Sequence, residues 1–313
     1  MLTDTVEPGR ILLTGANGHL GRRTIARIGA GAARPVRAVV RSERAAAVLR
    51  ALDTGADVEV YVLDYHDEEA LTRAADGCDT AVHFVGIILE NKHNRFADAH
   101  EATCRAMAAA AQRAGLRRIV YLSILGSRPD SPNACLASKG RAEEILLNGS
   151  TPAVVLRVPM VIGPGDTVSR QLSNQARSRF VPLLRGGVAV EQPIDAEDVV
   201  SAILGALDRP GQEDIALDLA GPESITRREL LERTAALHGN RPTVIPIPRA
   251  LELFAAAALE AILSAPPLTR AMIGVLDRDD AVETATACGR LGIHLTPLDE
   301  TLERYVGPKA QWP

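Results

Sequence analysis

The stretch "TGANGHLGR" (residues 14–22) places Gly15, Gly18 and Gly21 directly between an apolar run and a helix-like segment. In such a position the first glycine makes a tight turn and the second lets backbone approach a pyrophosphate. The third allows close packing of the helix on the strand. The N–H groups at the start of the helix then bind phosphate. The stretch therefore predicts a dinucleotide-binding loop. The competing interpretation is that the glycines serve only a tight crossover.

Apolar, strand-like runs alternate with helix-like segments through the first half of the chain. The runs are "RILLTG" (10–15), "PVRAVVRS" (35–42), "VEVYVLD" (58–64), "DTAVHFVG" (79–86), "RRIVYLSILG" (117–126) and "PAVVLRVPMVIG" (152–163). Among the helix-like segments, one covers about 96–114 and ends before Gly115, and another covers about 134–147. Repeated strand–helix–strand units build a parallel sheet with helices on both faces. We therefore predict an α/β fold, a Rossmann-type doubly wound parallel sheet.

The pattern changes after residue 163. A "GPGD" turn (163–166) precedes a polar helix-like stretch (168–180), and residues 194–210 read as a helix that begins with acidic residues. Thr226 and Glu229 form a capping-box pattern at the start of a further helix. We expect a nucleotide-binding domain over residues 1–165, with segments at about 188–220 returning to the large sheet. A smaller, interleaved substrate or partner region would comprise 166–187 and 221–313.

Composition narrows the class of protein. The net charge of −4 shows no basic excess, so we expect no nucleic-acid partner. Four scattered cysteines without a CxxC motif favour a reducing compartment and no structural metal. The polar start has no secretion segment, so we expect a cytoplasmic protein. The apolar stretch 250–263 is too short to span a bilayer. It predicts a packed amphipathic helix, with docking on a membrane surface or a protein partner as the alternative.

Many stretches together resemble the short-chain dehydrogenase/reductase superfamily, in its extended and atypical, epimerase/dehydratase-like branches. More narrowly, they resemble the group of the alpha-subcomplex subunit 9 of respiratory complex I. The resemblance covers nearly the whole chain. It is carried by "LTGANGHLGRR", "VVRSERA", "LDYHDEEAL", "HFVGII", "RFADAHEATCRAMAAAAQRAGLRRIVYLSILGS", "SKGRAEE", "LRVPMVIGPGD", "PIDAEDVVSAI", "PPLTRAMI" and "LGIHLTPLDETL".

The resemblance implies a bound dinucleotide and indicates which one. Where an acidic residue would hold a ribose 2′-hydroxyl, this chain has Arg41 and Ser42. Because arginine pairs with a 2′-phosphate, we expect NADP(H) in preference to NAD(H), which stays possible. The alternative for Arg41 is a solvated arginine at the end of a strand. Asp64 is expected to contact the adenine, and its alternative is a cap for the next helix. The cofactor-binding residues implied by the resemblance are Gly15, Asn17, Gly18, His19, Leu20, Gly21, Arg41, Ser42, Asp64, Tyr65, Val85, Gly86, Lys139 and Pro159.

The catalytic positions depart from the family pattern. Related reductases use a Tyr-x-x-x-Lys pair, in which lysine binds the nicotinamide ribose and tyrosine exchanges a proton with the substrate. Lys139 matches the lysine, but Cys135 stands at the tyrosine position. A thiol with an ordinary pKa of about 8.5 permits proton exchange, and the neighbouring ammonium could lower that pKa. Cys135 is thus a proton donor, a redox nucleophile or simply a small buried residue.

Ser123 is the third catalytic candidate, because it ends the fifth strand and could reach the nicotinamide or the substrate. It could equally bond its own backbone. Where the extended family places the substrate-holding hydroxyl, this chain has Leu125, with Ser127 in reserve.

Other polar residues offer weaker candidates. Tyr121 lies inside a strand and does not obviously replace the missing tyrosine. We expect His83 to be a core histidine, and His93 and His100 are minor candidates for proton donation. Asp195 and Asp198 read as helix-start residues rather than a catalytic pair.

Two functions therefore stay open. The first is an NADP(H)-dependent atypical reductase of a small carbonyl or apolar substrate, with a non-standard proton donor. The second is a non-catalytic NADP(H)-binding structural, sensor or assembly protein, which Cys135 and the complex I resemblance favour. Sugar-nucleotide epimerisation needs the missing tyrosine even more directly.

Overall fold

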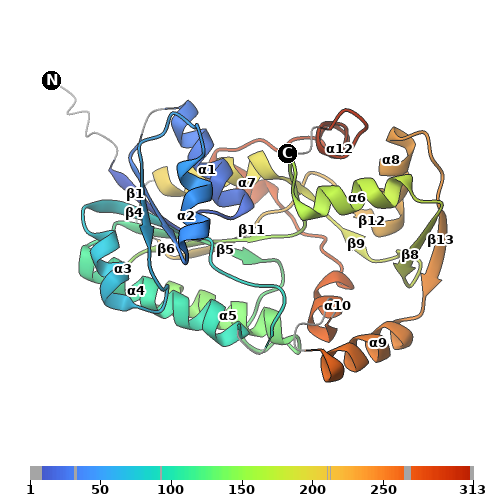
Figure 1. Ribbon diagram of the computed structural model, residues 1–313, viewed down its shortest axis with the longest axis horizontal. Helices are drawn as coiled ribbons and strands as arrows, with labels where there is room; N and C mark the ends of the chain where they lie inside the picture. Colours follow the sequence, from blue (N-terminus) through green and yellow to red (C-terminus); the bar gives the residue numbers. More distant parts are fainter. Residues whose placement is uncertain are drawn as a thin grey trace.

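The computed structural model describes residues 9–31, 34–91, 94–209, 211, 213–263 and 269–310. Its centre is a parallel, seven-stranded sheet with the order β3-β2-β1-β4-β5-β6-β11 (Figure 1). The strands are β1 (Arg10–Thr14), β2 (Val36–Val40), β3 (Val58–Val62), β4 (Cys78–His83), β5 (Arg118–Ile124), β6 (Ala153–Val158) and β11 (Ile215–Asp218). The order reverses between β1 and β4, where such sheets open a ligand crevice at their carboxyl edge. The predicted Rossmann-type, doubly wound sheet is confirmed.

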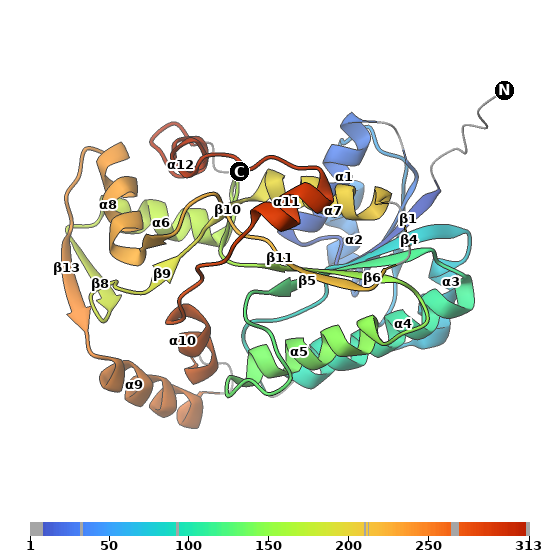
Figure 2. The ribbon, with the colours of Figure 1, turned by 180° about the vertical axis from the view of Figure 1, so that it is seen from behind.

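Helices cover both faces of this sheet, as Figures 1 and 2 show. One face packs against α1 (His19–Ala30), α2 (Glu43–Arg50), α7 (Ala196–Asp208) and α11 (Ala285–Leu291). The other packs against α3 (Glu68–Ala75), α4 (Thr103–Ala114) and α5 (Ala134–Leu147). Successive strand residues point to opposite faces, so Ile11 and Leu13 enter the first core and Leu12 the second. Burial on both faces explains why these strands are apolar throughout.

The strands and helices of the first half begin and end close to the predicted positions. Helix α5 covers 134–147 as expected, and Gly115 ends α4 in the left-handed conformation. The helix predicted from residue 96 starts instead with a π-helical turn, η1 (Ala97–Ala102). The prediction of a helix to residue 180 is wrong. Helix α6 (Thr167–Arg177) stops earlier, because Phe180–Leu184 form β8 and pair in parallel with β13 (Thr243–Ile247).

Beyond residue 165, strand β11 joins the large sheet and helices α7 and α11 pack on it, while most other elements form a smaller layer beside it. Three two-stranded sheets lie there: β7 (Val161–Ile162) with β10 (Ile194–Asp195), β9 (Val190–Glu191) with β12 (Ile225–Thr226), and β8 with β13. Helices α6, α8 (Arg227–Leu237) and α12 (Leu298–Tyr305) contribute to a separate apolar cluster. Thr226 caps α8 by accepting from the N–H of Glu229, as the capping pattern predicts.

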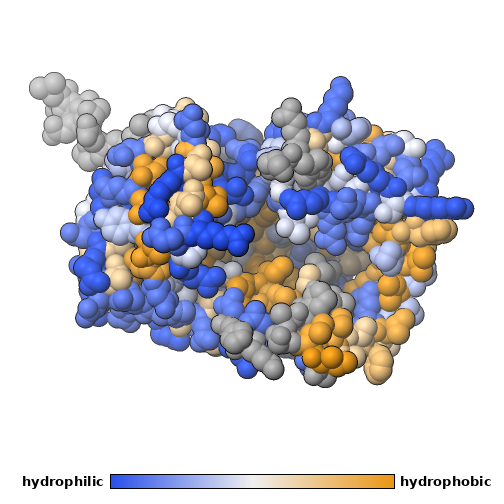
Figure 3. All heavy atoms as spheres, viewed as in Figure 1, coloured by the Kyte–Doolittle hydropathy of each residue, from blue (hydrophilic) through white to orange (hydrophobic). Residues whose placement is uncertain are grey.

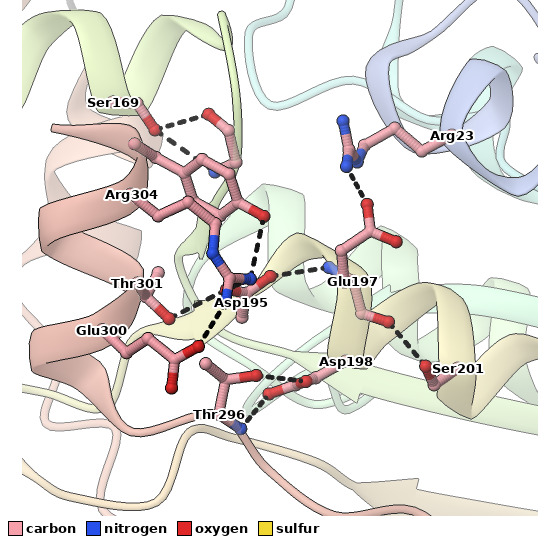
Figure 4. Close-up of polar contacts among 12 residues, drawn as sticks. Arg23, Ser169, Asp195, Glu197, Asp198, Ser201, Thr296, Glu300, Thr301 and Arg304 are labelled. Atoms are coloured by element: carbon pink, nitrogen blue, oxygen red, sulfur yellow. Dashed lines mark hydrogen bonds and ion pairs between the residues drawn. The ribbon is translucent and has the colours of Figure 1, made fainter. Parts of the chain in front are cut away.

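A polar cluster fastens the C-terminal segment to α7 (Figure 4). Asp195 caps α7 by accepting from the N–H of Glu197 at 2.8 Å, and its other oxygen accepts from Thr301 of α12 at 2.9 Å. Asp198 accepts from both the N–H and the hydroxyl of Thr296. Burial raises the pKa of both aspartates. Both carboxylates are therefore helix-start residues with a structural role, as the sequence indicates.

Helix α9 (Arg249–Ile262) lies below β8 and β13 in Figure 1, and α10 (Arg270–Leu276) packs between α9 and the start of α5. Within the described part of the chain, no helix is both long and apolar enough to cross a membrane.

Candidate functional site

The loop between β1 and α1 has the geometry of a phosphate-binding turn. Gly15 has a left-handed φ of 72°, and a Cβ there would lie 3.1 Å from the Cβ of Phe84. Gly18 is the N-cap of α1 and brings no capping side chain. The first N–H groups of the helix are therefore available to an anion. The residues present fit the pyrophosphate of a dinucleotide.

The other residues of the loop hold it in place. A Cβ on Gly21 would lie only 2.5 Å from a backbone oxygen of the preceding turn, so this glycine permits the close approach of α1. Leu20 packs against the core, whereas Asn17 is exposed. The Nε2 of His19 lies 3.0 Å from the carbonyl oxygen of Pro164. His19 thus ties the loop to the turn that follows the last strand of the first half.

Arg41 and Tyr65 meet at the end of β2, where an adenosine ribose would lie. Arg41 is exposed and forms no ion pair with the described residues, although its charge contributes to the lowered pKa of the nearby Asp64. Its central carbon lies 5.9 Å from the ring centre of Tyr65. The Tyr65 hydroxyl is buried, donates to Val39 O at 3.2 Å and accepts from the N–H of Gly15 at 3.1 Å. The Tyr65 hydroxyl therefore holds the backbone of the glycine loop against β2, and the Arg41 guanidinium faces solvent.

Asp64 and Ser42 have local partners. The Asp64 carboxylate accepts from the backbone N–H of His66 at 3.0 Å and lies 2.7 Å from its ring. These two contacts, the backbone one first, lower the pKa of Asp64. The alternative of Asp64 as a helix cap is wrong, because Asp67 caps α3. Ser42 caps α2.

A cavity of about 490 Å³ opens at the carboxyl ends of β4, β5 and β6. Its walls are mostly apolar, and its polar side chains are those of Ser123 and Lys139. The lining residues are Phe84, Gly86, Ile87, Ile88, Leu89, Leu122, Ser123, Ile124, Lys139, Val158 and Pro159. Val85, by contrast, is buried in the core. This is where the fold would place a nicotinamide and a substrate.

Lys139 lies at the wall of this cavity with its side chain almost completely buried. Its Nζ donates to the hydroxyl of Tyr121 at 2.9 Å and to the carbonyl oxygen of Leu122 at 3.1 Å. An ammonium has three donors, so one is left for a ligand in the cavity. Burial lowers the pKa of Lys139, and Cys104, Cys135 and Glu143 nearby oppose that shift.

Cys135 is fully buried one helical turn before Lys139 and is not among the residues that line the cavity. Its thiol donates to the carbonyl oxygen of Ile87 at 3.7 Å. Burial raises the pKa of Cys135 to about 11, although the Lys139 charge works in the opposite direction. The expectation that the ammonium lowers this pKa below its ordinary value is therefore wrong. At neutral pH the thiol is protonated and turned toward backbone.

Ser123 is linked to a buried carboxylate. Its hydroxyl donates to Glu143 in a short hydrogen bond, and Glu143 also binds Arg157 at 2.6 Å. Because the hydroxyl hydrogen points to Glu143, the oxygen offers lone pairs to the cavity. Ser123 is thereby suited to accept from a donor such as a carboxamide N–H. In this arrangement it offers no hydrogen to a carbonyl oxygen.

The histidines near the cavity are held by the protein. His83 lies between the hydroxyls of Thr14, at 2.7 Å, and Thr103, at 3.3 Å, and is the core histidine that the sequence predicts. His100 lies in the π-helical turn, and its Nε2 accepts from the N–H of Ile87 at 3.1 Å. Burial lowers the pKa of both rings to about 3, so both are neutral at pH 7. His93 lies outside the described residues.

Sequence reasoning missed one residue of this site, Glu143, and set another aside, Tyr121. Glu143 lies four residues after Lys139 on the same helix, a spacing that could have drawn attention to it. Tyr121 carries no such signal. Only the packing of α5 on β5 brings its hydroxyl to Lys139.

The fold and the loop define a Rossmann-type NAD(P)-binding protein with the architecture of extended short-chain dehydrogenases/reductases. The chain belongs to the NAD(P)H-binding family, whose model matches residues 15–210.

The relatives agree with this assignment. The mitochondrial NADH dehydrogenase [ubiquinone] 1 alpha subcomplex subunit 9 of Arabidopsis thaliana is 27% identical over 293 residues, which are 91% of this chain and 72% of that protein. The predicted resemblance to this complex I group is thus confirmed. A ceramide reductase of Caulobacter vibrioides is 30% identical over 254 residues, covering 81% of this chain and 78% of the relative.

Solved structures share the fold. A Citrobacter triphenylmethane reductase in complex with NADP(H) superposes with a TM-score of 0.72 at 21% identity, covering 94% of this chain and 99% of the other. A nucleoside-diphosphate-sugar epimerase of Staphylococcus aureus superposes with a TM-score of 0.75 at 19% identity, covering 94% and 100%. At these low sequence identities, the two superpositions show that the fold is shared and nothing more.

Proposed function

We propose that this protein is an NADP(H)-dependent reductase of a carbonyl group on a small or apolar substrate. The observation that carries the proposal is Lys139, a buried ammonium with one free donor at the wall of an apolar cavity. The similarity of this chain to a ceramide reductase supports a hydride-transfer reaction and an apolar substrate.

The choice of NADP(H) rests on the end of β2. Arg41 is exposed there, and the two residues that directly follow the strand, Arg41 and Ser42, include no carboxylate in the place where one would repel a 2′-phosphate. Arginine binds phosphate through charge-assisted hydrogen bonds. NAD(H) would gain nothing from this charge.

The chain's own residues then have distinct tasks. Gly15, Gly18 and the start of α1 hold the pyrophosphate, and the third donor of Lys139 binds the nicotinamide ribose. Ser123 accepts from the carboxamide, which orients the ring over the apolar wall. When bound, NADPH supplies the hydride. The apolar residues of the cavity exclude water from the reacting carbon and favour an apolar substrate.

The proton must come from a different source than in the family pattern. The Cys135 thiol donates its hydrogen to Ile87 O, and the hydroxyl hydrogen of Ser123 is turned to Glu143. Neither Ser123, which lines the cavity, nor Cys135, which does not, therefore protonates a substrate oxygen directly. We assign this step to solvent water that reaches the substrate oxygen at the open mouth of the cavity, away from the reacting carbon, and is left as hydroxide.

The proposal also assigns a role to each part of the chain. Residues 1–165, with the returning segment 188–220, would bind nucleotide. Residues 166–187 and 221–313 would serve substrate or partner. All four cysteines are free thiols, which fits a reducing compartment such as the cytoplasm.

The test is turnover with purified protein. NADPH consumption is followed by nicotinamide absorbance with short-chain, aromatic and long-chain lipid ketones, and products are identified by mass spectrometry. NADPH-dependent formation of an alcohol from any of them supports the proposal. Complete inertness across the panel, with nucleotide tightly retained, would instead establish the second candidate.

That second candidate is a non-catalytic NADP(H)-binding protein with a structural, sensor or assembly role. Two observations favour it: Cys135 replaces the family's tyrosine, and the Arabidopsis relative is a complex I subunit. In that case Lys139 and Arg41 would serve nucleotide retention alone.

A further inference from the structure

Helix α9 exposes its apolar side and turns its acidic residues inward. Leu251, Phe254 and Ile262 fall at positions i, i+3 and i+11, which share one face of a helix. They are 58%, 74% and 80% exposed. Glu260 lies on the opposite side and binds Arg270 of α10 at 2.8 Å. A helix of a globular protein normally shows the reverse arrangement, with its apolar stripe toward the core.

The apolar surface continues onto the small sheet before α9. Strand β13 leads directly into the helix through Pro248. In the parallel pair, Phe180 lies beside Thr243 and Pro182 beside Ile245, and all four are exposed. The alternate residues Val181 and Leu183 of β8 are buried against Leu231. The outward face of this sheet is therefore apolar although it faces solvent.

We call this surface the β8–β13–α9 face; its apolar members are Phe180, Pro182, Ile245, Leu251, Phe254 and Ile262. Figure 3 shows the apolar residues gathered over α9 at the lower right and along the right edge, over β8 and β13. Exposed apolar surface of this extent marks an interaction site.

The two segments that carry β8 and β13 are rich in arginine, in a chain whose net charge is −4. Residues 177–190 and 238–251 contain arginines at five positions and no aspartate or glutamate. These are Arg177, Arg179, Arg185, Arg241 and Arg249. Arg185 and Arg249 both pair with Asp277 of the segment after α10, at 3.3 and 3.5 Å. In the described part of the chain, Arg179 and Arg241 form no ion pair, and the Arg179 guanidinium lies 5.2 Å from the ring centre of Phe180.

We propose that the β8–β13–α9 face docks the protein on a lipid bilayer that carries anionic headgroups. A helix lying in the interface, with phenylalanine and leucine inserted and arginines beside it, is the arrangement that such binding requires. A second copy of this chain fits less well. A twofold interface would bring the arginines of both copies together. The inference goes beyond the proposed function, because docking needs no turnover.

Docking would also bring the bilayer close to the site. Helices α9 and α10, with Asn133 at the start of α5 and Glu90 after the apolar loop, line a cavity of about 650 Å³. The loop that supplies Glu90 also supplies Ile88 and Leu89 to the candidate substrate cavity. This loop therefore separates the cavity beside α9 from the candidate substrate cavity.

The test is sedimentation of the full chain with vesicles of phosphatidylcholine, with and without phosphatidylglycerol. The protein should bind the anionic vesicles, bind phosphatidylcholine much more weakly and be released by salt. Phe254→Ser with Ile262→Ser should weaken binding by about tenfold for each side chain removed. Arg179→Gln with Arg241→Gln should weaken binding to anionic vesicles by about fivefold per arginine. Val48→Ser, at an exposed apolar position on α2, is the matched control and should bind as wild type.

Circular dichroism checks that each variant is folded, and light scattering reports the oligomeric state. Absence of vesicle binding, or binding unchanged by both double variants, would overturn the proposal. So would a dimer that Phe254→Ser with Ile262→Ser dissociates while vesicles bind nothing, since that would assign the face to a second copy. None of these outcomes depends on reductase activity, so the two proposals fail separately.

Discussion

Lys139 donates a 2.9 Å hydrogen bond to the hydroxyl of Tyr121, a tyrosine buried inside β5. The site therefore contains a tyrosine beside its lysine, but on the core side of the sheet rather than in the cavity. Burial raises the pKa of Tyr121 well above its usual value, so it cannot act as an acid near pH 7. Its role is to hold the ammonium in place.

Tyr121→Phe should remove that support and leave Lys139 with Leu122 O alone. A buried hydrogen bond to a charged group contributes about 1.5–3 kcal/mol. We expect NADPH affinity to fall by roughly tenfold and the free energy of unfolding to fall by about 1–2 kcal/mol. Fluorescence titration and urea unfolding measure the two effects. Tyr61→Phe, on the exposed edge strand β3, is the control; equal effects from both variants would contradict this role of Tyr121.

Gly86→Ala should displace Lys139 without unfolding the protein. A Cβ at residue 86 would lie 2.8 Å from Nζ, which is the mobile end of a long side chain. We therefore expect weaker NADPH binding, by about fivefold or more, at nearly unchanged stability. Gly289→Ala, where a Cβ meets nothing within 4 Å, is the matched control. Wild-type affinity in the Gly86 variant would show that Lys139 does not contact the nucleotide.

Arg41→Ala should erode the preference for NADP(H). Loss of a charge-assisted contact to phosphate costs about 1.5–3 kcal/mol, which corresponds to roughly tenfold to hundredfold in affinity. NAD(H) affinity should hardly change, because its ribose carries no 2′-phosphate. Competition titrations with both nucleotides give the ratio, and Arg44→Ala serves as the neighbouring control. An unaltered ratio of NADP(H) to NAD(H) affinity would show that Arg41 does not bind the 2′-phosphate.

Cys135→Ser should retain most of the turnover, within about threefold of wild type, because a group with a pKa of about 11 that bonds backbone is no proton donor at neutral pH. The pH profile of kcat should also be unchanged. Measuring both over pH 6 to 9 separates this outcome from a catalytic role. A large loss of kcat together with a shifted profile would make Cys135 a catalytic residue.

Stability should fall in acid because of His83 and His100. Their folded-state pKa is about 3 against an ordinary value of 6.5, so the unfolded chain binds more protons between these values. The stabilisation is complete above pH 6.5 and is lost as pH falls toward 3. Urea unfolding at several pH values should show this slope. His83→Gln should reduce it, and an unchanged slope in that variant would contradict this role of His83.

Much of the fold could be predicted from the sequence because its signals are local. Glycines at residues 15, 18 and 21, alternating apolar runs and acidic helix starts such as Asp195 each act through their own backbone or the adjacent turn. The parallel strand order follows from the right-handed connections between them. The end of α6 was missed because β8 forms only by pairing with β13, more than fifty residues later.

By itself, then, the sequence determined the Rossmann sheet, the phosphate loop and the departure of Cys135 from the family pattern. Only the tertiary structure decided what the polar groups of the site do. Burial keeps the Cys135 thiol protonated, the packing of α5 on β5 joins Lys139 to Tyr121, and Glu143 turns the hydrogen of Ser123 away from the cavity. These outcomes depend on desolvation and on contacts between distant segments, which no local pattern encodes.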